Sequence, residues 1–358
     1  MEEHPHVSIR DLAARLGIGR SAVSMALRNH PHISEATRLR VQAEAERLGY
    51  RPNAMVTALM SQVRTRRVKR SGETIAYLSA FKTKEEWKHS TLHDGTLLGA
   101  QARAERLGFR VEPYWLGYQG GEAARVARVL RARAVRGVIV GPMPLDLGPV
   151  ELDWGNIFAA AIGYSFGQQH LDRISHNHFN IMRLCYESLY RRGHRRIGLS
   201  ITQESDDRVQ HLWMAGFDTS RKLLKGSMVP PLWLEHWEDH PDSKKRFEKW
   251  YWAHKPDAVI GMGGDNPLHW MRAMGVDVPK NTSYSNLDLA HLNQGKVAGV
   301  LQNVRAAGAS AVDWVVAGIN RNEYGVPDNP KSLLMEATWS DGPTVGPRSV
   351  PARKKSTG

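Results

Sequence analysis

The sequence has 358 residues, of which 41% are hydrophobic, with 49 Lys and Arg against 36 Asp and Glu and a single cysteine. This length favours two or three domains over one, the lone Cys185 excludes an intramolecular disulfide, and no apolar run approaches the roughly 20 residues of a membrane helix. The net charge of +13 points to a polyanionic partner, and the acidic start without a secretory signal predicts a cytoplasmic protein.

The excess positive charge is concentrated at the two ends of the chain. The first 72 residues contain 13 Lys and Arg against 6 Asp and Glu, and residues 341–358 contain 4 against 1. A nearly neutral middle with a basic head is typical of a nucleic-acid-binding module attached to a larger domain. We therefore expect four parts: a DNA-binding domain at 1–50, a hinge helix and basic linker at 51–72, a larger domain at 73–340, and a disordered basic tail at 341–358.

Three short helices are predicted in the first 50 residues. Ser8 and Ser34 have the character of N-caps, and Gly17 can end the first helix in a left-handed turn. Three short helices with a tight turn between the first two form a helix-turn-helix unit. Its predicted inward-facing residues are Ile9, Leu12, Ala13, Leu16, Val23, Ala26, Leu27, Thr37, Val41, Ala45 and Leu48.

The second of these helices, from about Gly19, has small and polar residues on its outer face, which lets it enter the major groove. Arg20 suits guanine edges, and Ser21 or Ser24 suits bases or phosphates. The start of the third helix can hold phosphates. The alternative is an ordinary solvated face on a small helical bundle. The predicted DNA contacts in this unit are Ser8, Gly19, Arg20, Ser21, Ala22, Ser24, Met25, Arg28, Ser34, Thr37 and Arg38.

In the connector at 51–72, the sequence predicts a helix of about two turns that begins at Asn53. A helix this short is not stable alone in water. It is apolar without a core of its own, and five basic residues follow it between 64 and 70. This pattern suits a segment that folds against DNA, with Asn53 and Leu59 as contacts and Leu59 as a wedge in the minor groove. The alternative is a basic linker whose apolar residues pack on the larger domain.

The stretch from Val7 to Leu59 resembles the DNA-binding headpiece of the lactose-repressor (LacI/GalR) family. The resemblance rests on the elements A-x-x-x-G, A-V-S, I-S-x-x-T-R and L-G-Y-x-P-N. It implies that Arg20 and Ser21 help to choose the operator and that Leu59 intercalates. One position departs from the family pattern: the residue after Ser24 is usually arginine and is Met25 here, so a common DNA contact is absent and the operator is expected to be atypical.

From Glu73 onward, short apolar strands alternate with amphipathic helices, which predicts parallel α/β sheets in two lobes. Clefts at the carboxyl ends of such strands bind small molecules. This part resembles the periplasmic-binding-protein-like effector domain of the same family, through "LYRRGHRRIGL", "PDAVIGM", "YSNLD" and "AAGASAVDWVVAGI". The expected fold is therefore an all-α helix-turn-helix headpiece followed by a two-lobed α/β effector domain.

The resemblance also implies a small, carbohydrate-related effector in the cleft between the lobes. Asp288 matches the aspartate of the family's G-[FY]-D element, and Asp265 and Asn266 lie about one residue from its N-D pair. Trp213 stands where an effector-binding arginine is common, so Arg208 is a possible substitute. Tryptophans such as Trp87, Trp213 or Trp270 can stack on a sugar ring. The predicted effector contacts are Phe81, Trp87, Arg208, Trp213, Asp265, Asn266 and Asp288.

Other motifs carry little chemistry. His176 and His178 are predicted on one face of a strand, which would be half of a zinc site, but no third ligand is evident. The sequence "GMGG" at 261–264 lacks the lysine of a P-loop, and there is no G-x-S-x-G or H-E-x-x-H motif. We predict no catalytic residues, no metal and no cofactor.

The predicted function is a sequence-specific transcriptional regulator, a dimeric repressor whose pseudopalindromic operator matches its twofold symmetry. The resemblance implies dimerisation through the effector domains and allosteric control by ligand, which would separate the two hinge helices. Two alternatives remain open: a ligand-independent architectural DNA-binding protein, and an α/β enzyme that acts on a sugar.

Overall fold

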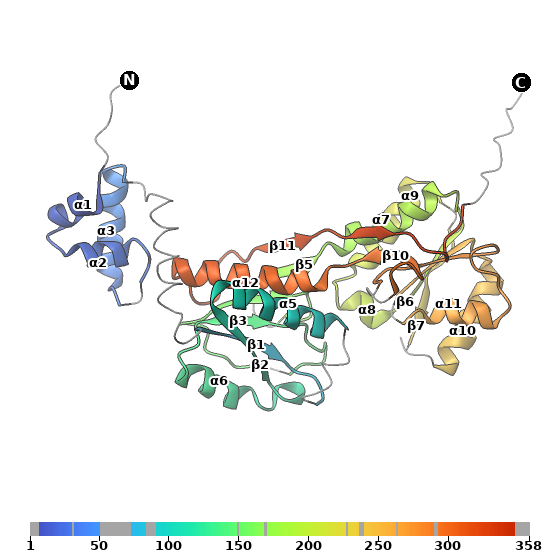
Figure 1. Ribbon diagram of the computed structural model, residues 1–358, viewed down its shortest axis with the longest axis horizontal. Helices are drawn as coiled ribbons and strands as arrows, with labels where there is room; N and C mark the ends of the chain where they lie inside the picture. The colour runs from blue at the N-terminus through green and yellow to red at the C-terminus, as the bar shows by residue number, and fades with distance from the viewer. Residues whose placement is uncertain are drawn as a thin grey trace, which may run out of the picture. The chain divides into compact units, whose positions relative to one another are not determined.

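A computed structural model describes residues 7–30, 32–50, 73–83, 91–148, 150–167, 170–226, 228–235, 240–262, 264–289 and 293–347. The chain, traced in Figure 1, divides into two compact units. The first comprises Met1–Ile162, Gln168–Asp172 and Gly308–Lys331, and the second comprises Gly163–Gly167, Arg173–Ala307 and Ser332–Gly358. Of the helices that these ranges contain, none is long and apolar enough to cross a membrane.

The first 50 residues form the predicted three helices, α1 (Ile9–Leu16), α2 (Arg20–Ala26) and α3 (Glu35–Arg47). Ser8 and Asp11 complete a capping box at the start of α1, and Gly17 ends that helix with φ 67°, a left-handed conformation that glycine adopts without strain. Gly19 is the N-cap of α2, and Ser34 is the N-cap of α3.

A small core holds these three helices together. Leu12, Val23, Ala26 and Val41 are fully buried in it, and most of the remaining predicted inward-facing residues pack at its edge. This core is built from few and mainly small side chains, and most apolar residues of the three helices are used in it. The outer face of α2 is therefore mostly polar or small. The predicted division of α2 into a buried and an outer face is confirmed for Val23 and Ala26.

The larger part of the chain contains two six-stranded sheets. The first has the strand order β11-β5-β4-β3-β1-β2, and we call the α/β domain built on it the first lobe. The β1–β2, β1–β3, β3–β4 and β5–β11 pairs are parallel. Its elements are β1 (Glu73–Ser79), α5 (Thr91–Leu107), β2 (Phe109–Trp115), a 3-10 turn at Tyr118–Gly120, α6 (Ala123–Ala132), β3 (Gly137–Val140), β4 (Phe158–Ile162), β5 (Asp172–His176), α12 (Val304–Arg321) and β11 (Ser332–Met335).

In Figure 1, α5 and α12 lie on one side of the first sheet and α6 on the other. Two glycines of α12 permit this packing. At Gly308 a Cβ would collide with the carbonyl oxygen of Thr96 on α5, and at Gly318 it would collide with the ring of Phe158 on β4. The strands between the helix layers are buried: every residue of β3 and β4 is enclosed, as expected for a parallel sheet covered on both faces.

The second sheet has the order β12-β10-β9-β8-β6-β7, with β12 antiparallel to β10, and we call its domain the second lobe. One apolar cluster lies under α7 and α9, and another lies under α10 and α11. Its elements are α7 (His178–Arg191), β6 (Ile197–Thr202), α8 (Gln203–Asp207), α9 (Leu212–Leu223), β7 (Leu232–Leu234), α10 (Pro241–His254), β8 (Ala258–Gly261), α11 (Asn266–Ala273), β9 (Ser283–Asn286), β10 (Ala298–Leu301) and β12 (Thr338–Ser340).

Two sequence-based predictions of local structure are wrong. His176 and His178 do not share one face of a strand, because β5 ends at His176 and α7 begins at His178. Asn177 between them is the N-cap of α7, and its side chain accepts a hydrogen bond from the backbone N–H of Asn180. An Asn side chain in this position competes with strand pairing and favours a helix start.

The second wrong prediction concerns the basic tail, whose first seven residues are folded. Thr344 is buried: its hydroxyl accepts a hydrogen bond from the backbone N–H of Ala298 and donates one to the carbonyl of Tyr284. Asp341 accepts a hydrogen bond from the indole N–H of Trp339 at 2.7 Å. These contacts tie 341–347 to the second sheet, while residues 348–358 lie outside the described ranges.

Candidate nucleic-acid interface and effector site

The outer face of α2 presents the residues that the sequence assigned to base contacts. Arg20 and Ser21 are exposed at the start of the helix, next to the Gly19 N-cap, and Ala22, Ser24 and Met25 are half-buried beside them. Arg28 is held by a hydrogen bond from its Nε to the carbonyl oxygen of Ser24 at 2.9 Å. The first turn of α2 therefore offers one exposed guanidinium and one exposed hydroxyl, groups that hydrogen-bond to base edges.

The predicted phosphate contacts at the other two helix starts take part in capping. The Ser8 hydroxyl donates to Asp11 Oδ2 at 2.7 Å, and hydrogen bonds from Ser8 lower the pKa of the Asp11 carboxyl. The hydroxyls of Ser34 and Thr37 lie 2.8 Å apart, and Arg38 lies 3.6 Å from Glu35 on α3. These groups order the helix starts, where the backbone N–H groups can also face a phosphate.

Three predicted site residues, Asn53, Leu59 and Trp87, lie outside the described residues. Phe81 belongs to the first lobe, where its carbonyl oxygen accepts the indole N–H of Trp115 at 2.8 Å. The other predicted effector contacts belong to the second lobe, after strands β6, β8 and β9, which are neighbours in the sheet. The carboxyl ends of parallel neighbours meet at one edge, so the loops that follow these strands lie where α/β proteins bind ligands.

Asp265 is the best-anchored side chain at this edge. It is buried, and its carboxylate accepts hydrogen bonds from the Tyr284 hydroxyl at 3.2 Å and from the side-chain amides of Asn286 at 2.6 Å and Asn293 at 2.8 Å. The carboxylate also raises the already high pKa of Tyr284, although burial of the phenol is the larger cause. With three donors engaged, Asp265 is placed to organise the loops of the edge.

Asp288 is differently placed. Its backbone N–H donates to Asn286 Oδ1 at 2.8 Å, so Asn286 links it to Asp265, while its own side chain is exposed. Desolvation by the surrounding protein nevertheless raises the pKa of the Asp288 carboxyl to about 6. Asn266 is half-buried at the start of α11. Asp288 is thus the accessible carboxylate of this edge.

The remaining predicted contacts are partly withdrawn from the edge. Arg208 forms an ion pair with Glu204 at 2.9 Å. Trp213 is 1% exposed and Trp270 is 2% exposed, and both pack in the second-lobe core. Neither indole presents a free face on which a sugar ring could stack in this conformation.

A buried aromatic cluster was not predicted from the sequence as a unit. The ring of His178 lies 4.6 Å from that of Trp213, 5.9 Å from that of Tyr164 and 6.2 Å from that of His176. His176 Nε2, His178 Nδ1 and Trp213 Nε1 are buried without a hydrogen-bond partner among the described residues. The "HNH" motif is the only sequence signal for this cluster, and the sequence predicts no metal there because a third ligand is missing.

Burial keeps both imidazoles of this cluster neutral. Desolvation lowers the pKa of His178 to about 3, and desolvation also lowers the pKa of His176 against a hydrogen bond to the backbone of Asn303. Across the described part of the chain, no group of three or more His, Cys, Asp or Glu side chains is arranged to hold a metal ion. The cluster can therefore offer neutral donors and acceptors to a polar group.

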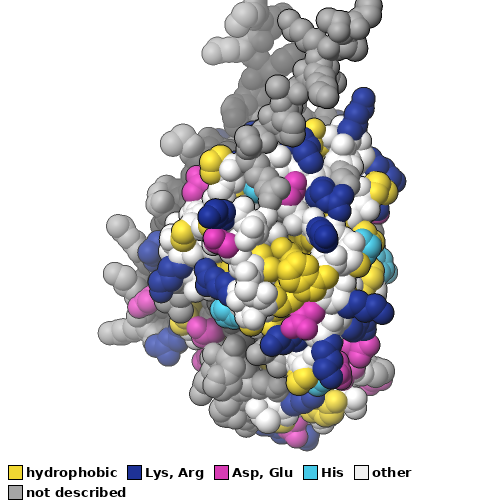
Figure 2. Space-filling view, turned by 90° about the vertical axis from the view of Figure 1, so that its right-hand side faces the viewer, with side chains coloured by type: hydrophobic (Ala, Val, Ile, Leu, Met, Phe, Trp, Pro, Cys, Tyr) yellow, Lys and Arg dark blue, Asp and Glu magenta, His cyan; other side chains and the backbone are white. Residues whose placement is uncertain are grey.

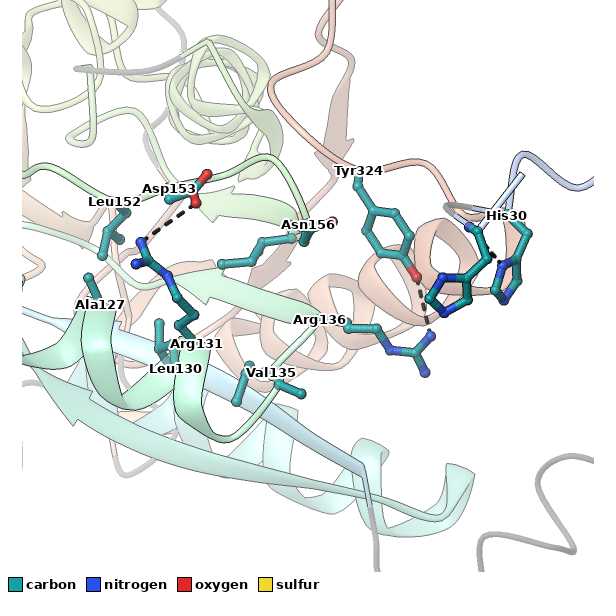
Figure 3. A pocket seen from close by; sticks show the side chains of 13 residues that line it. His30, Ala127, Leu130, Arg131, Val135, Arg136, Leu152, Asp153, Asn156 and Tyr324 are labelled. Carbon is teal, nitrogen blue, oxygen red and sulfur yellow. Dashed lines mark hydrogen bonds and ion pairs between the residues drawn. The ribbon is translucent and has the colours of Figure 1, made fainter. Parts of the chain in front are cut away.

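A separate pocket of about 450 Å³ lies in the first unit, at the ends of α6 and α12 (Figure 3). Arg131 spans one side of it and lies 3.6 Å from Asp153, while Arg136 donates to the Tyr324 hydroxyl at 3.4 Å. The pocket is lined by Ala127, Leu130, Arg131, Ala134, Val135, Arg136, Leu152, Asp153, Asn156, Ile157 and Tyr324, with His30 and His32 of the helical domain.

Two protein-family models match the chain. The model described as bacterial regulatory proteins of the lacI family matches residues 8–53, which contain all three helices of the helix-turn-helix domain. The model described as a periplasmic binding protein-like domain matches residues 186–344, which contain most of the second lobe. No curated protein sequence matches the chain.

Solved structures share this fold at low sequence identity. A transcriptional regulator CelR–cellobiose complex matches with a TM-score of 0.59 and 20% identity over 95% of this chain and 100% of that chain. The lac repressor dimer bound to operator and the anti-inducer ONPF matches with a TM-score of 0.61 and 19% identity, over 95% of this chain and 99% of that chain. A periplasmic binding protein/LacI transcriptional regulator from Alkaliphilus metalliredigens complexed with D-xylulofuranose matches with a TM-score of 0.56 and 14% identity, over 76% of this chain and 99% of that chain. With its helix-turn-helix domain and its ligand-binding-type lobes, the chain belongs to the lacI family of bacterial regulatory proteins, which are DNA-binding transcriptional regulators.

Proposed function

We propose that the protein is a dimeric repressor that binds a pseudopalindromic operator and is controlled by a small, carbohydrate-related effector. The observation that carries this proposal is the division of α2. Val23 and Ala26 are buried, while Ser21 is exposed on the opposite face and Arg20 is exposed at the margin of that face. A helix with this division can pack on α1 and α3 and still enter a major groove with its polar face.

Base reading by the helical domain involves Arg20, Ser21, Ser24 and Met25, with Leu59 as the minor-groove wedge. Arginine pairs with guanine O6 and N7 in two hydrogen bonds, which discriminates against a wrong base by about 1–3 kcal/mol. An apolar side chain inserted between base steps kinks the duplex and permits further contacts. Met25 offers only an apolar contact, for which a thymine methyl group is the suitable partner.

A dimer is proposed because a single helical domain this small reads too few bases for useful specificity, and twofold symmetry doubles the site. The lac repressor of similar fold is a dimer bound to operator. The second lobe has exposed apolar side chains, with Leu223 67%, Met228 63% and Trp252 54% accessible. Figure 2 shows an apolar area bordered by lysine and arginine side chains on one face of the molecule, and such areas are common at protein–protein contacts.

The effector site is proposed at the carboxyl ends of β6, β8 and β9 in the second lobe, with Arg208, Asn266 and Asp288 as contacts and Asp265 as the organiser. Proteins of similar fold are complexed with cellobiose and with D-xylulofuranose. Carboxylates and amides are suitable partners for sugar hydroxyls. Ligand binding that favours one lobe arrangement changes DNA affinity by the coupling free energy, for which 1–3 kcal/mol corresponds to about 5–150-fold. No catalytic role is proposed.

The experiment compares a full site with a half-site. The DNA sequence that the purified full-length protein prefers is made as an intact duplex and as a duplex with one half randomised, and sedimentation velocity gives the mass of each complex. Two protomers on the intact site, and a loss of at least a hundredfold in affinity on the half-site, support the proposal. One protomer with equal affinity for both duplexes contradicts it.

A further inference from the structure

The starts of the strands of the first lobe form a positively charged edge, which we call the amino edge. The register places Glu73 of β1 beside Phe109 of β2, and Gly137 of β3 beside Phe158 of β4. Helices α5 and α6 end at the same edge, at Leu107 and Ala132, because each leads directly into the next strand. The end of α5, the start of β2 and the end of α6 therefore bring their arginines to one edge of the sheet, with those of α5 and α6 on its opposite sides (Figure 1).

Three arginines of this edge already have acidic partners. Arg136 pairs with Glu73, Arg133 donates to Glu112 Oε1 at 3.0 Å, and Arg131 lies 3.6 Å from Asp153. Figure 3 shows Arg131 and Arg136 on opposite sides of the pocket at this edge. Each of these pairs joins one arginine to one carboxylate and is therefore neutral. The carboxylates in them are not available to the additional arginines of the edge.

Three further arginines of this edge are without such a partner among the described residues. Arg106 lies in the last turn of α5, Arg110 is the second residue of β2, and Arg128 is on the exposed face of α6, and all three are exposed. In the ranges that the structure describes, their guanidinium groups take part in no hydrogen bond or ion pair, in contrast to Arg103 and Arg125, which pair with Asp313 and Glu122. Glu105, next to Arg106 on α5, is also exposed and takes part in no ion pair among the described residues, so the edge carries an excess of positive charge that is smaller than three.

The chain connection determines which partner can reach this edge. The DNA-binding domain ends near Tyr50, and residues 51–72 join it to Glu73, the first residue of β1 and part of the amino edge. The connector carries Arg64, Arg66, Arg67, Lys69 and Arg70, so the run of positive charge continues up to the edge. Because only 22 residues separate Tyr50 from Glu73, a duplex held by α2 cannot lie far along the chain from this edge.

We propose that the amino edge of the first lobe is a second DNA-binding surface, in which Arg106, Arg110 and Arg128 contact phosphates of the duplex held by the helix-turn-helix domain. The partner is the phosphate backbone, because exposed arginines on flexible side chains present charge without a fixed pattern of base-reading groups. The contacts add affinity without sequence preference. They go beyond the proposed repressor function, since they require no operator and no effector.

Arg106, in the last turn of α5, also has an explanation within the fold. Helix C-termini carry a partial negative charge, and arginine in the last turn stabilises a helix by about 0.3–1 kcal/mol. This role predicts an effect on thermal unfolding and none on the salt dependence of DNA binding. The two explanations therefore separate in a single set of variants.

The test measures DNA affinity against salt for the full-length protein. Fluorescence anisotropy on a labelled duplex of arbitrary sequence gives the slope of log K against log salt concentration from about 0.05 to 0.3 M. Removing one phosphate contact reduces the slope by about 0.9, so the triple variant R106A/R110A/R128A is expected to lower it by about 2.7 for each subunit. A duplex without operator sequence keeps this result independent of whether the repressor proposal holds.

A charge-matched control removes three exposed basic residues of the second lobe that also have no ion-pair partner among the described residues, in the variant K245A/K249A/R272A. We expect this control to keep the slope of the wild type to within one contact. If the edge variant has the wild-type slope, or if both triple variants lower it equally, the amino edge is not a DNA-binding surface. The variant R106K/R110K/R128K keeps the three charges and is expected to have most of the slope of the wild type. A slope that falls only in the alanine variant then reflects lost charge and not misfolding.

Discussion

Asn286, at the end of β9, donates a hydrogen bond from its side-chain amide to Asp265 Oδ1 across 2.6 Å, and accepts one at its own oxygen from the backbone N–H of Asp288 at 2.8 Å. This amide therefore joins the loops that follow β8 and β9. The carboxylate of Asp265 completes the link with Tyr284 and Asn293. The two aspartates that follow these neighbouring strands thus have different roles. Asp265 holds the loops of the edge together, and Asp288 faces solvent.

Replacing Asp265 with alanine is expected to lower the free energy of unfolding by roughly 2–5 kcal/mol. The buried donors of Tyr284 and Asn286 would lose their acceptor, at about 1–3 kcal/mol for each buried group left unpaired. Asp265 also has φ 58°, a left-handed conformation that alanine tolerates less well than aspartate. Urea unfolding of both proteins measures the difference.

The matched control is Asp288→Ala, whose exposed side chain should cost less than about 1 kcal/mol. Under the proposed function this control instead weakens effector binding. Equal losses of stability in the two variants would show that the Asp265 network does not organise this edge.

His178 is expected to make the protein less stable as the pH falls. Its pKa is about 3 in the folded chain against an ordinary value of 6.5, so the unfolded chain binds more protons between these pH values. The free energy of unfolding therefore falls as the pH is lowered from 6.5 towards 3, by at most about 1.4 kcal/mol per pH unit for this group.

The variant His178→Phe keeps an aromatic ring against Trp213 and removes the titrating group. Chemical unfolding at about pH 6.5, 5.5 and 4.5 should show a shallower loss of stability for the variant than for the wild type. Parallel curves for the two proteins would mean that the imidazole of His178 is not buried in its neutral form.

Arg20→Ala is expected to relax the preference at one base pair in each half-site and to weaken specific binding by about 1–3 kcal/mol, because the two hydrogen bonds to a guanine edge are lost. Sequence selection with the variant identifies the affected position. Arg10, exposed on α1, supplies the control: Arg10→Ala should leave the selected sequence unchanged, and an unchanged sequence for Arg20→Ala as well would remove Arg20 as a base reader.

Leu59→Ala is expected to weaken binding to the preferred sequence tenfold or more while affinity for arbitrary DNA changes little, since a minor-groove wedge acts only where the duplex is kinked. Both affinities are measured at the same salt concentration. Leu39 on α3 is 57% exposed, and Leu39→Ala is the control for the loss of an exposed leucine. Equal losses on both DNAs for Leu59→Ala would contradict the wedge role.

The helical domain could be predicted from the sequence because its signals are local. Ser8 with Asp11, Gly17 and Ser34 fix the helix limits within a few residues. The helical period within each helix gives the core, as Val23 with Ala26 on α2 and Val41 with Ala45 on α3 show. The strands and helices of the lobes follow in the same way from alternating apolar runs, as β1, β3 and α6 show.

The site in the lobes depends on contacts between distant residues, and these were not predicted. Asp265 is bound by Tyr284, Asn286 and Asn293, which lie 19, 21 and 28 residues away. Trp213 is buried because it packs against α7. This contact is between distant residues, so the sequence does not show whether the indole lies in the core or is free to stack on a sugar. His176 and His178 alternate with Asn177 as residues of a strand do, and this alternation hides the N-cap signal of Asn177, which begins α7.

The central claim is that the exposed face of α2 reads a defined sequence through a twofold symmetric dimer. The measurement that tests it most directly is selection of duplex DNA from a random pool by the full-length protein at about 0.15 M salt, because nonspecific phosphate attraction is weakened there. We predict enrichment of a pseudopalindrome whose two half-sites each depend on Arg20. A pool that stays random after selection, although the protein binds DNA, would contradict the claim.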